Sequence, residues 1–167
     1  LSETGRLRRV IVHTPGAEIE AMRPSRAEEE LYNDIIPLEV VKREHSQLKG
    51  FLAKVAEVSE LGDLLVDALG SVEHRKRFAT MLADHYGAGH RLPELEELDA
   101  GPLAKAAIGG LPARHVRLAS YVRGADFDIP PLPNMYFMRD AAMVYKDKSI
   151  SSAMRFPVRR AEALINR

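Results

Sequence analysis

A middle segment with only helical patterns separates two outer segments in which strands and helices alternate. Between Gly62 and Arg114 the apolar residues recur at helical spacing, and Gly and Pro residues divide them into about four or five short helices. On either side, short runs rich in β-branched residues predict strands. This order indicates an α/β protein with three parts. Residues 1–61 form a first α/β segment, residues 62–115 an inserted helical domain, and residues 116–167 a return to the α/β segment.

The first sixty residues predict a strand, a helix and a second strand, in that order. Arg8–His13 is the first strand, Pro37–Val55 is a helix with its apolar residues on one face, and Glu57–Leu61 is the second strand. Between the first strand and the long helix, Arg26–Leu31 predicts a short acidic helical turn with Ser25 as its N-cap.

The last part predicts several short strands and a closing helix. A Pro-rich stretch at its centre is expected to be extended or looped. The strands are expected at Val116–Val122, Met135–Phe137, Ala142–Lys146 and Ser149–Ser152, the extended stretch at Asp126–Pro133, and the helix at Pro157–Ile165.

Composition excludes several classes of function. The 24 basic and 24 acidic residues balance, so there is no general electrostatic reason to bind nucleic acid or an anionic membrane. No apolar run approaches the roughly 18 residues that a membrane span needs. Cysteine is absent, which excludes disulfides, thiolate metal sites and a Cys nucleophile within these residues. We therefore expect a cytoplasmic globular protein without nucleic-acid or membrane partners.

The stretch Pro130–Asp140 carries the most chemical information. Its prolines restrict the backbone just before Asn134, Phe137 and Asp140. A carboxylate such as Asp140 matches the geometry of a guanidinium, and the Phe137 ring can lie against such a cation. Asn134 offers both a donor and an acceptor to the backbone atoms of an amino acid. Arg159, nineteen positions beyond Asp140, can bind a carboxylate.

These residues resemble a known family. PLPNMYFMRD followed by MRFPVRR is similar to the paired motifs of the arginine deiminases, and GRLRRVIVHTPG, EEELYNDI, REHSQL and LAKAAIGGLP resemble further segments of those enzymes in the same order. The resemblance covers nearly the whole chain. It implies part of a pentein-type α/β-propeller, built from ββαβ modules, with an α-helical bundle domain inserted in the first module.

The resemblance also implies a reaction, the conversion of L-arginine and water to L-citrulline and ammonia. Carried over to this sequence, Asp140 holds the guanidinium, Asn134 and Arg159 hold the amino-acid end, and Phe137 lines the pocket. In this family a Cys thiolate forms a covalent intermediate, assisted by a His, and neither a cofactor nor a metal takes part. Those two groups, together with a second Asp and a Glu, belong to later segments of the family that this sequence does not contain.

Two kinds of departure from the family pattern stand out. Ala141 follows Asp140 where Pro is common, Met138 replaces a small polar residue, and Asn33 precedes Asp34 where two acidic residues are often found. These changes bear on arginine as the substrate more than on the fold. The second departure is the missing remainder: we expect a truncated chain that is inactive alone. Because such a piece leaves strand edges and apolar surface exposed, we also expect a homo-oligomer or a partner chain.

Alternative interpretations remain open. An amidinotransferase would use the same intermediate, and a non-catalytic ligand-binding module would retain only half of the pocket. Strand alternation would turn Arg139 away from Asp140, and Arg160 competes with Arg159 for the pocket. His45 is expected to be a hydrogen-bonded core residue and His13 to anchor a turn.

Overall fold

The computed structural model describes residues 5–114, 126–145 and 147–166. The chain divides into two compact units: the first consists of Leu1–Leu64 together with Pro133–Arg167, and the second of Leu65–Leu132. Both helices and small sheets are present, so the predicted α/β class is confirmed.

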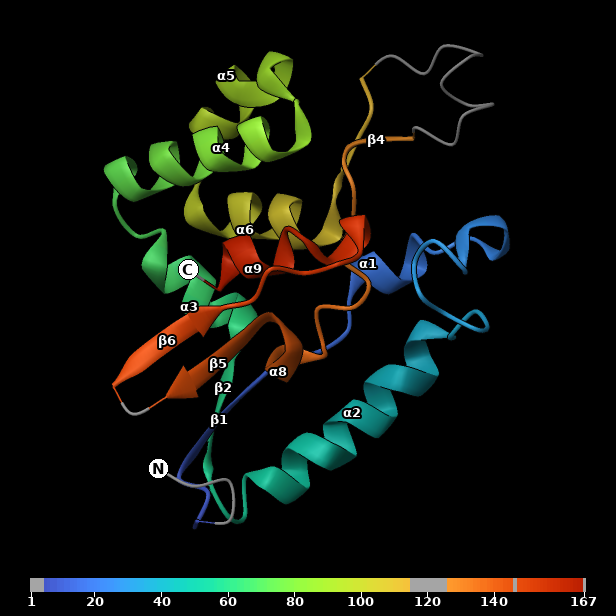
Figure 1. Ribbon diagram of the computed structural model, residues 1–167, viewed down its shortest axis with the longest axis vertical. Helices are drawn as coiled ribbons and strands as arrows, with labels where there is room; N and C mark the ends of the chain where they lie inside the picture. The colour runs from blue at the N-terminus through green and yellow to red at the C-terminus, as the bar shows by residue number, and fades with distance from the viewer. Residues whose placement is uncertain (1–4, 115–125, 146, 167) are drawn as a thin grey trace. The chain divides into compact units, whose positions relative to one another are not determined.

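The first half of the first unit is a strand, helix, strand arrangement. Its elements are β1 (Arg9–Val12), α1 (Ala17–Glu20), the 3-10 turn η1 (Pro24–Arg26), α2 (Leu38–Leu52) and β2 (Glu57–Glu60). The strands β1 and β2 pair in parallel, from Arg9 opposite Glu57 to Val12 opposite Glu60 (Figure 1). The predicted order of strand, helix and strand is therefore confirmed. Pro37 is the N-cap of α2, where its missing N–H costs no hydrogen bond.

The end of β2 is fixed by polar contacts of Glu60. Its carboxylate accepts hydrogen bonds from the backbone N–H and the hydroxyl of Thr14, at 3.1 and 2.6 Å. Lys49 on α2 donates a further bond of 2.6 Å. Burial acts to raise the pKa of Glu60, but the bonds from Lys49 and Thr14 outweigh it and lower the pKa below its usual value. Glu60 thereby joins α2, β2 and the turn after β1.

The second half of the first unit contains a hairpin between short helices. Its elements are α8 (Met138–Ala141), β5 (Ala142–Tyr145), β6 (Lys148–Ser151), the 3-10 turn η3 (Pro157–Arg159) and α9 (Glu162–Ile165). β5 and β6 pair antiparallel, with Ala142 opposite Ser151 (Figure 1). The strands expected at both positions and the helix expected after Pro157 are confirmed, although the helix begins as a 3-10 turn.

Two local predictions are wrong. Met135–Phe137 is a turn rather than a strand, because the Phe137 N–H bonds to the Asn134 carbonyl at 3.0 Å and α8 follows directly. Arg139 therefore lies beside Asp140 on a helical turn, and strand alternation does not apply to it. Ser25 is not an N-cap: it lies inside η1, whose first position is Pro24 and whose N-cap is Arg23.

The second unit is mainly helical. Its elements are the end of α3 (Leu61–Ala68), α4 (Val72–Tyr86), the 3-10 turn η2 (Gly89–Arg91), α5 (Leu92–Glu97), α6 (Ala100–Gly109), and the antiparallel strands β3 (Leu111–Pro112) and β4 (Phe127–Ile129). Its core consists largely of aliphatic residues, including Leu82, Leu95, Leu103, Ala107 and Ile129. The expected run of short helices is confirmed. The expected strand at Val116–Val122 lies outside the described residues.

Caps and one buried charge network fix this unit. The Ser71 hydroxyl accepts a bond of 3.1 Å from the His74 N–H at the start of α4. Arg91, 4% exposed, donates to Asp128 at 2.8 Å and to the Pro112 carbonyl at 3.1 Å. Because Asp128 follows Phe127 in β4, the Arg91 guanidinium ties the strand pair to the helix α5 that begins beside it.

Several large apolar side chains of the first unit are exposed. Within the described chain α2 has no buried residue, and its Phe51 and Leu48 are 64% and 51% exposed. On the hairpin, Met143 and Tyr145 are exposed to a similar degree. No helix in the described ranges has the length and apolar character that crossing a membrane requires.

Candidate active site

Asp140 and Arg159 form an ion pair in the first unit. Asp140 lies on α8 and Arg159 ends η3, and the Arg159 Nη1 donates to the Asp140 Oδ2 over 2.6 Å. The Asp140 side chain is 49% exposed and that of Arg159 is 12% exposed. The pair therefore lies where a mostly buried cation meets a carboxylate that solvent can reach.

Glu162 holds the other side of the same guanidinium. The Arg159 Nε and Nη2 donate to the two carboxylate oxygens of Glu162, each over 2.8 Å. Glu162 opens α9 three residues after Arg159, and its side chain is 1% exposed. This is the parallel two-bond geometry that guanidinium and carboxylate groups favour. Arg159 thus bridges a buried carboxylate and an accessible one.

Phe137 lies against the same cation. Its ring centroid is 5.7 Å from the guanidinium carbon of Arg159, within the range of a cation–π contact. The Phe137 side chain is exposed, and its ring also contacts that of Tyr136, with 4.2 Å between the two centroids. Asp140 and Phe137, the two residues expected to hold a substrate guanidinium, therefore both contact the guanidinium of Arg159.

Asn134 lies in the buried turn before α8. Its side-chain amide donates a hydrogen bond of 2.9 Å to the backbone carbonyl of Glu30, and the residue is 3% exposed. Close by, the Tyr32 hydroxyl donates a hydrogen bond of 2.6 Å to the Pro133 carbonyl. At least one donor of Asn134 is therefore committed to the protein backbone, which fixes the turn that leads to Phe137 and Asp140.

We call Arg159 and the three residues that contact it, Asp140, Glu162 and Phe137, the Arg159 cluster. Its electrostatics follow from its burial. Burial acts to lower the pKa of Arg159, but its hydrogen bonds to Glu162 and Asp140 outweigh this effect and raise the pKa above its usual value. Burial raises the pKa of Glu162, against the opposing effect of Arg159. A carboxylate that accepts two N–H bonds at once is ionised, because a protonated carboxyl would turn one oxygen into a donor.

Of the four sequence-predicted residues, three come together. Asp140, Phe137 and Arg159 form one cluster, whereas Asn134 points its amide at the loop before α2. Arg160 is exposed. Sequence reasoning missed Glu162, although the Arg159-x-x-Glu162 spacing, three residues apart at a helix start, was a signal for such a pair.

Two histidines of this unit, His13 and His45, differ in the hydrogen bonding of their ring nitrogens. His13 is buried and its Nε2 lies 3.0 Å from the Glu18 carboxylate, in agreement with a residue that anchors the turn. The prediction that His45 is a hydrogen-bonded core residue is wrong for its Nδ1. That atom is buried without a hydrogen-bond partner, and burial lowers the pKa of the half-buried ring.

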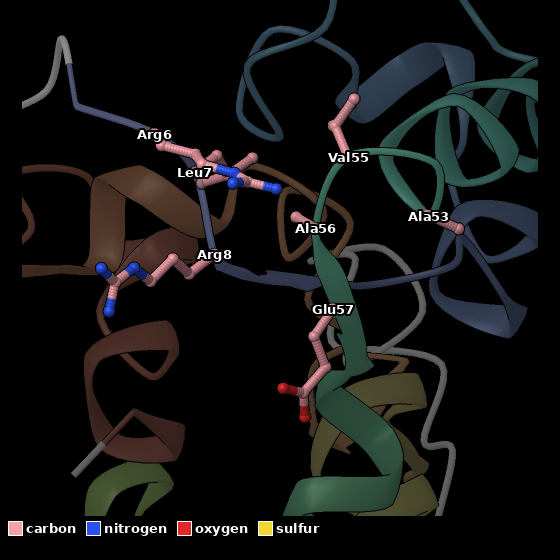
Figure 2. Close-up of a pocket in the computed structure, with 7 residues that line it drawn as sticks. All are labelled: Arg6, Leu7, Arg8, Ala53, Val55, Ala56 and Glu57. Atoms are coloured by element: carbon pink, nitrogen blue, oxygen red, sulfur yellow. The ribbon is translucent and has the colours of Figure 1, made fainter.

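One hollow in the described ranges is lined by residues outside the Arg159 cluster. A hollow of about 540 Å³ lies beside the start of β2 and is lined by Arg6, Leu7, Arg8, Ala53, Val55, Ala56 and Glu57 (Figure 2). Nearly all of these residues are exposed, and none belongs to the Arg159 cluster. Within the same ranges no three His, Asp or Glu side chains gather closely enough to hold a metal ion.

Comparison with known proteins relates the chain to named enzymes. No protein-family model matches the chain. Proteins named arginine deiminase are similar to it from Metamycoplasma arthritidis (28% identical, 99% of this chain and 42% of that protein), Oenococcus oeni (32%, 98% and 43%) and Mycobacterium tuberculosis (34%, 96% and 44%). The chain spans about two fifths of the length of these curated relatives. The predicted resemblance is therefore confirmed: over nearly its whole length this chain is similar to part of the arginine deiminases.

Proposed function

We propose that this chain supplies the guanidinium-binding part of an arginine deiminase, a hydrolase that converts L-arginine and water to L-citrulline and ammonia. The observation that carries the proposal is the Arg159 cluster. An Asp140 oxygen and the Phe137 ring together hold a guanidinium group, which in this structure is that of Arg159. A site that binds the guanidinium of its own arginine has the charge and the planar contact surface for that of a free arginine.

Each residue has a role in this proposal. Asp140 binds the substrate guanidinium and Phe137 lies along its face. Arg159 binds the substrate carboxylate through the nitrogen that now contacts Asp140, and Asn134 orients the amino-acid end or the turn that carries the site. No metal or cofactor is required by these contacts, because each one is a hydrogen bond or a cation–π contact.

The covalent step requires groups outside these residues. A Cys thiolate attacks the guanidinium carbon, the C–N bond to one terminal nitrogen breaks, and ammonia leaves after receiving a proton from a His. Water then attacks the carbon of the resulting amidino thioether, and citrulline and the thiolate are formed. Since the 167 residues contain no Cys, the nucleophile has to come from other polypeptide.

The fold that goes with this function is a pentein-type α/β-propeller with a helical domain inserted at residues 62–115. The division of the chain supports this proposal, since a mainly helical unit interrupts a mixed one in the sequence. The small separate sheets β1–β2 and β5–β6 are what incomplete propeller modules would contain. A solved structure of the natural gene product in full, with a closed ring of such modules or without one, would decide the matter.

The test is an assay of the natural gene product in full, with L-arginine as substrate. We expect citrulline and ammonia in equal amounts, and a loss of roughly a hundredfold or more in kcat/KM for Asp140→Asn, because charge-assisted hydrogen bonds are lost. The matched control is Asp147→Asn, at an exposed position of the hairpin turn, which should leave kcat/KM unchanged. Absence of citrulline from the wild-type protein contradicts the proposal.

The same assay distinguishes the alternatives. An amidinotransferase would release ornithine when an acceptor amine is present. A non-catalytic module would bind L-arginine in a calorimetric titration without turning it over. The guanidinium contacts of Asp140 and Phe137 serve all three functions equally well, so only the product separates them.

A further inference from the structure

Arg159 shares its guanidinium between two carboxylates of unequal accessibility. Two of its nitrogens bond to Glu162, which is 1% exposed, and the third bonds to Asp140, which is 49% exposed. With all three groups ionised, two negative charges face one positive charge. Among Arg159, Asp140 and Glu162 alone, negative charges therefore outnumber positive charges by one, and the more accessible carboxylate is that of Asp140.

This arrangement bears on how a substrate enters. The guanidinium of Arg159 occupies Asp140 and Phe137, so an incoming guanidinium competes with an identical group of the protein. An arginine that gave up its only carboxylate would be left mostly buried and unpaired, which is strongly unfavourable. Glu162 removes that penalty, because Arg159 keeps two charge-assisted hydrogen bonds after it leaves Asp140.

We propose that Glu162 is a positioning residue of the guanidinium site, which holds Arg159 so that the substrate guanidinium can replace it at Asp140. In the free protein the Arg159 Nη1 lies on Asp140. When a guanidino acid binds, its guanidinium takes over Asp140 and Phe137, and the Arg159 Nη1 turns to the ligand carboxylate. Arg159 stays anchored to Glu162 throughout. This inference rests on the proposed function, since it assumes that Asp140 receives a substrate guanidinium.

The charge of Glu162 has a measurable consequence. A neutral residue at position 162 would leave Asp140 as the charge partner of Arg159 within the cluster, and the two would form a closed pair. Binding of a cation would then have to break that pair. A ligand with a neutral side chain also draws Arg159 to its carboxylate, but it gains no charge–charge attraction to Asp140. Its affinity should therefore depend less on the charge at position 162.

The experiment uses the variant Glu162→Gln in the natural gene product in full. We expect KM for L-arginine to rise about tenfold while kcat changes by less than threefold, since the reacting atoms are untouched. The dissociation constant of L-citrulline, whose ureido group is neutral, should change by less than threefold. Glu162→Asp, which retains the charge, should recover at least part of the KM. The matched control Glu39→Gln, at a side chain 90% exposed, should leave all three constants unchanged.

Each other outcome overturns the proposal. An unchanged KM for L-arginine in Glu162→Gln would show that the charge has no part in exchange. An equal loss of citrulline and arginine affinity, or a fall in kcat alone, would show a general structural role. If the wild-type protein neither binds nor converts L-arginine, the proposed function fails instead, so the two failures are distinguishable.

A measurement on the wild-type protein covers the case in which Glu162→Gln does not fold. The Nε–H signal of Arg159 in a nitrogen-15 NMR spectrum, assigned by its loss in Arg159→Lys, reports the bond to Glu162. It should remain protected from exchange with solvent both with and without L-arginine. Loss of that protection when L-arginine binds would show that Arg159 leaves Glu162, against the proposal.

Discussion

The side chain of Asn134 donates a hydrogen bond of 2.9 Å to the backbone carbonyl of Glu30, across 104 positions of the sequence. The Tyr32 hydroxyl makes a second such link, to the Pro133 carbonyl at 2.6 Å. Between these two fixed points Leu31 has a φ of 65°, in the left-handed region that bulky residues avoid. The turn that carries the candidate site is thus attached to a strained backbone.

Replacing Leu31 by Gly should relieve this strain. The left-handed conformation costs an L-residue roughly 1–2 kcal/mol, and Gly adopts it freely, although Gly loses about 0.5–1 kcal/mol through the entropy of the unfolded chain. We expect the free energy of unfolding of Leu31→Gly to stay within about 1 kcal/mol of the wild type, on the stabilising side. Urea denaturation measures it.

The matched control is Leu64→Gly. Leu64 is exposed to the same 39% as Leu31 but lies in the helix α3, so Gly there should lower the free energy of unfolding by about 1 kcal/mol or more. Equal destabilisation by the two substitutions would contradict the assignment of strain to Leu31.

The buried carboxyl of Glu30 should make stability depend on pH. Glu30 is 5% exposed, its Oε2 is buried without a hydrogen-bond partner, and burial raises its pKa. A raised pKa in the folded state means that its contribution to stability is fully present at low pH and is lost as pH rises through the folded pKa. At pH 7, Glu30→Gln should therefore be more stable than the wild type by about 1 kcal/mol.

The difference should disappear below the usual pKa of a glutamate, where the wild-type carboxyl is protonated in both states. Glu28→Gln is the control, because the Glu28 side chain is exposed. Thermal unfolding at pH 7 and near pH 3.5 tests both variants. A Glu30→Gln variant that is less stable than the wild type at pH 7 would contradict the prediction that the charged Glu30 carboxyl destabilises the fold.

Gly110, after α6, leaves no room for a side chain. Its φ is 85°, and a Cβ there would lie 2.8 Å from the Pro131 backbone nitrogen and 2.9 Å from the Ile129 carbonyl oxygen. Gly110→Ala should lower the free energy of unfolding by roughly 1–3 kcal/mol, since backbone atoms have to move. Gly50→Ala, near the end of α2 with nothing within 4 Å of the added atom, should instead raise it by about 0.5–1 kcal/mol. Guanidinium denaturation compares the two, and a neutral Gly110→Ala would contradict this account.

The exposed apolar residues of α2 predict self-association. Phe51 is 64% exposed, and exposed apolar surface of this kind tends to be covered by a further polypeptide. We expect the wild-type chain to sediment as a concentration-dependent oligomer and Phe51→Ser to weaken the association by roughly tenfold or more. Lys54→Ser, another exposed residue three positions along, is the control. A wild-type monomer at high concentration would contradict the prediction.

Periodicity predicted the parts of the fold in which one local signal dominates. The helix α2 and the strand β1 are confirmed, since the helical spacing of apolar residues in the one and the β-branched residues of the other are strong local signals. Met135–Phe137 was predicted as a strand. The hydrogen bonds of Asn134, one of them to a residue more than a hundred positions away, favour a turn instead. Such a contact leaves no local signature.

The candidate site also depends on contacts between distant residues that the sequence does not reveal. The sequence indicated that Asp140, Phe137 and Arg159 act on one ligand, but it assigned Asp140 and Arg159 to opposite ends of that ligand. Their direct contact depends on how α8 and η3 pack, which spacing alone does not determine. The spacing of Arg159 and Glu162 alone does not reveal the role of Glu162, because exposed pairs three residues apart are common and weak, and its burial is a property of the folded chain.

The division of the chain sets an order of events during synthesis. The second unit is continuous from Leu65 to Leu132, so all of it has left the ribosome before Pro133 emerges. The first unit has to wait for its returning segment, which carries every residue of the Arg159 cluster. The nascent chain therefore contains the complete helical unit while Glu30 and Tyr32 still lack their hydrogen bonds to Asn134 and Pro133. The residues proposed to bind a guanidinium are therefore synthesised only after the whole helical unit.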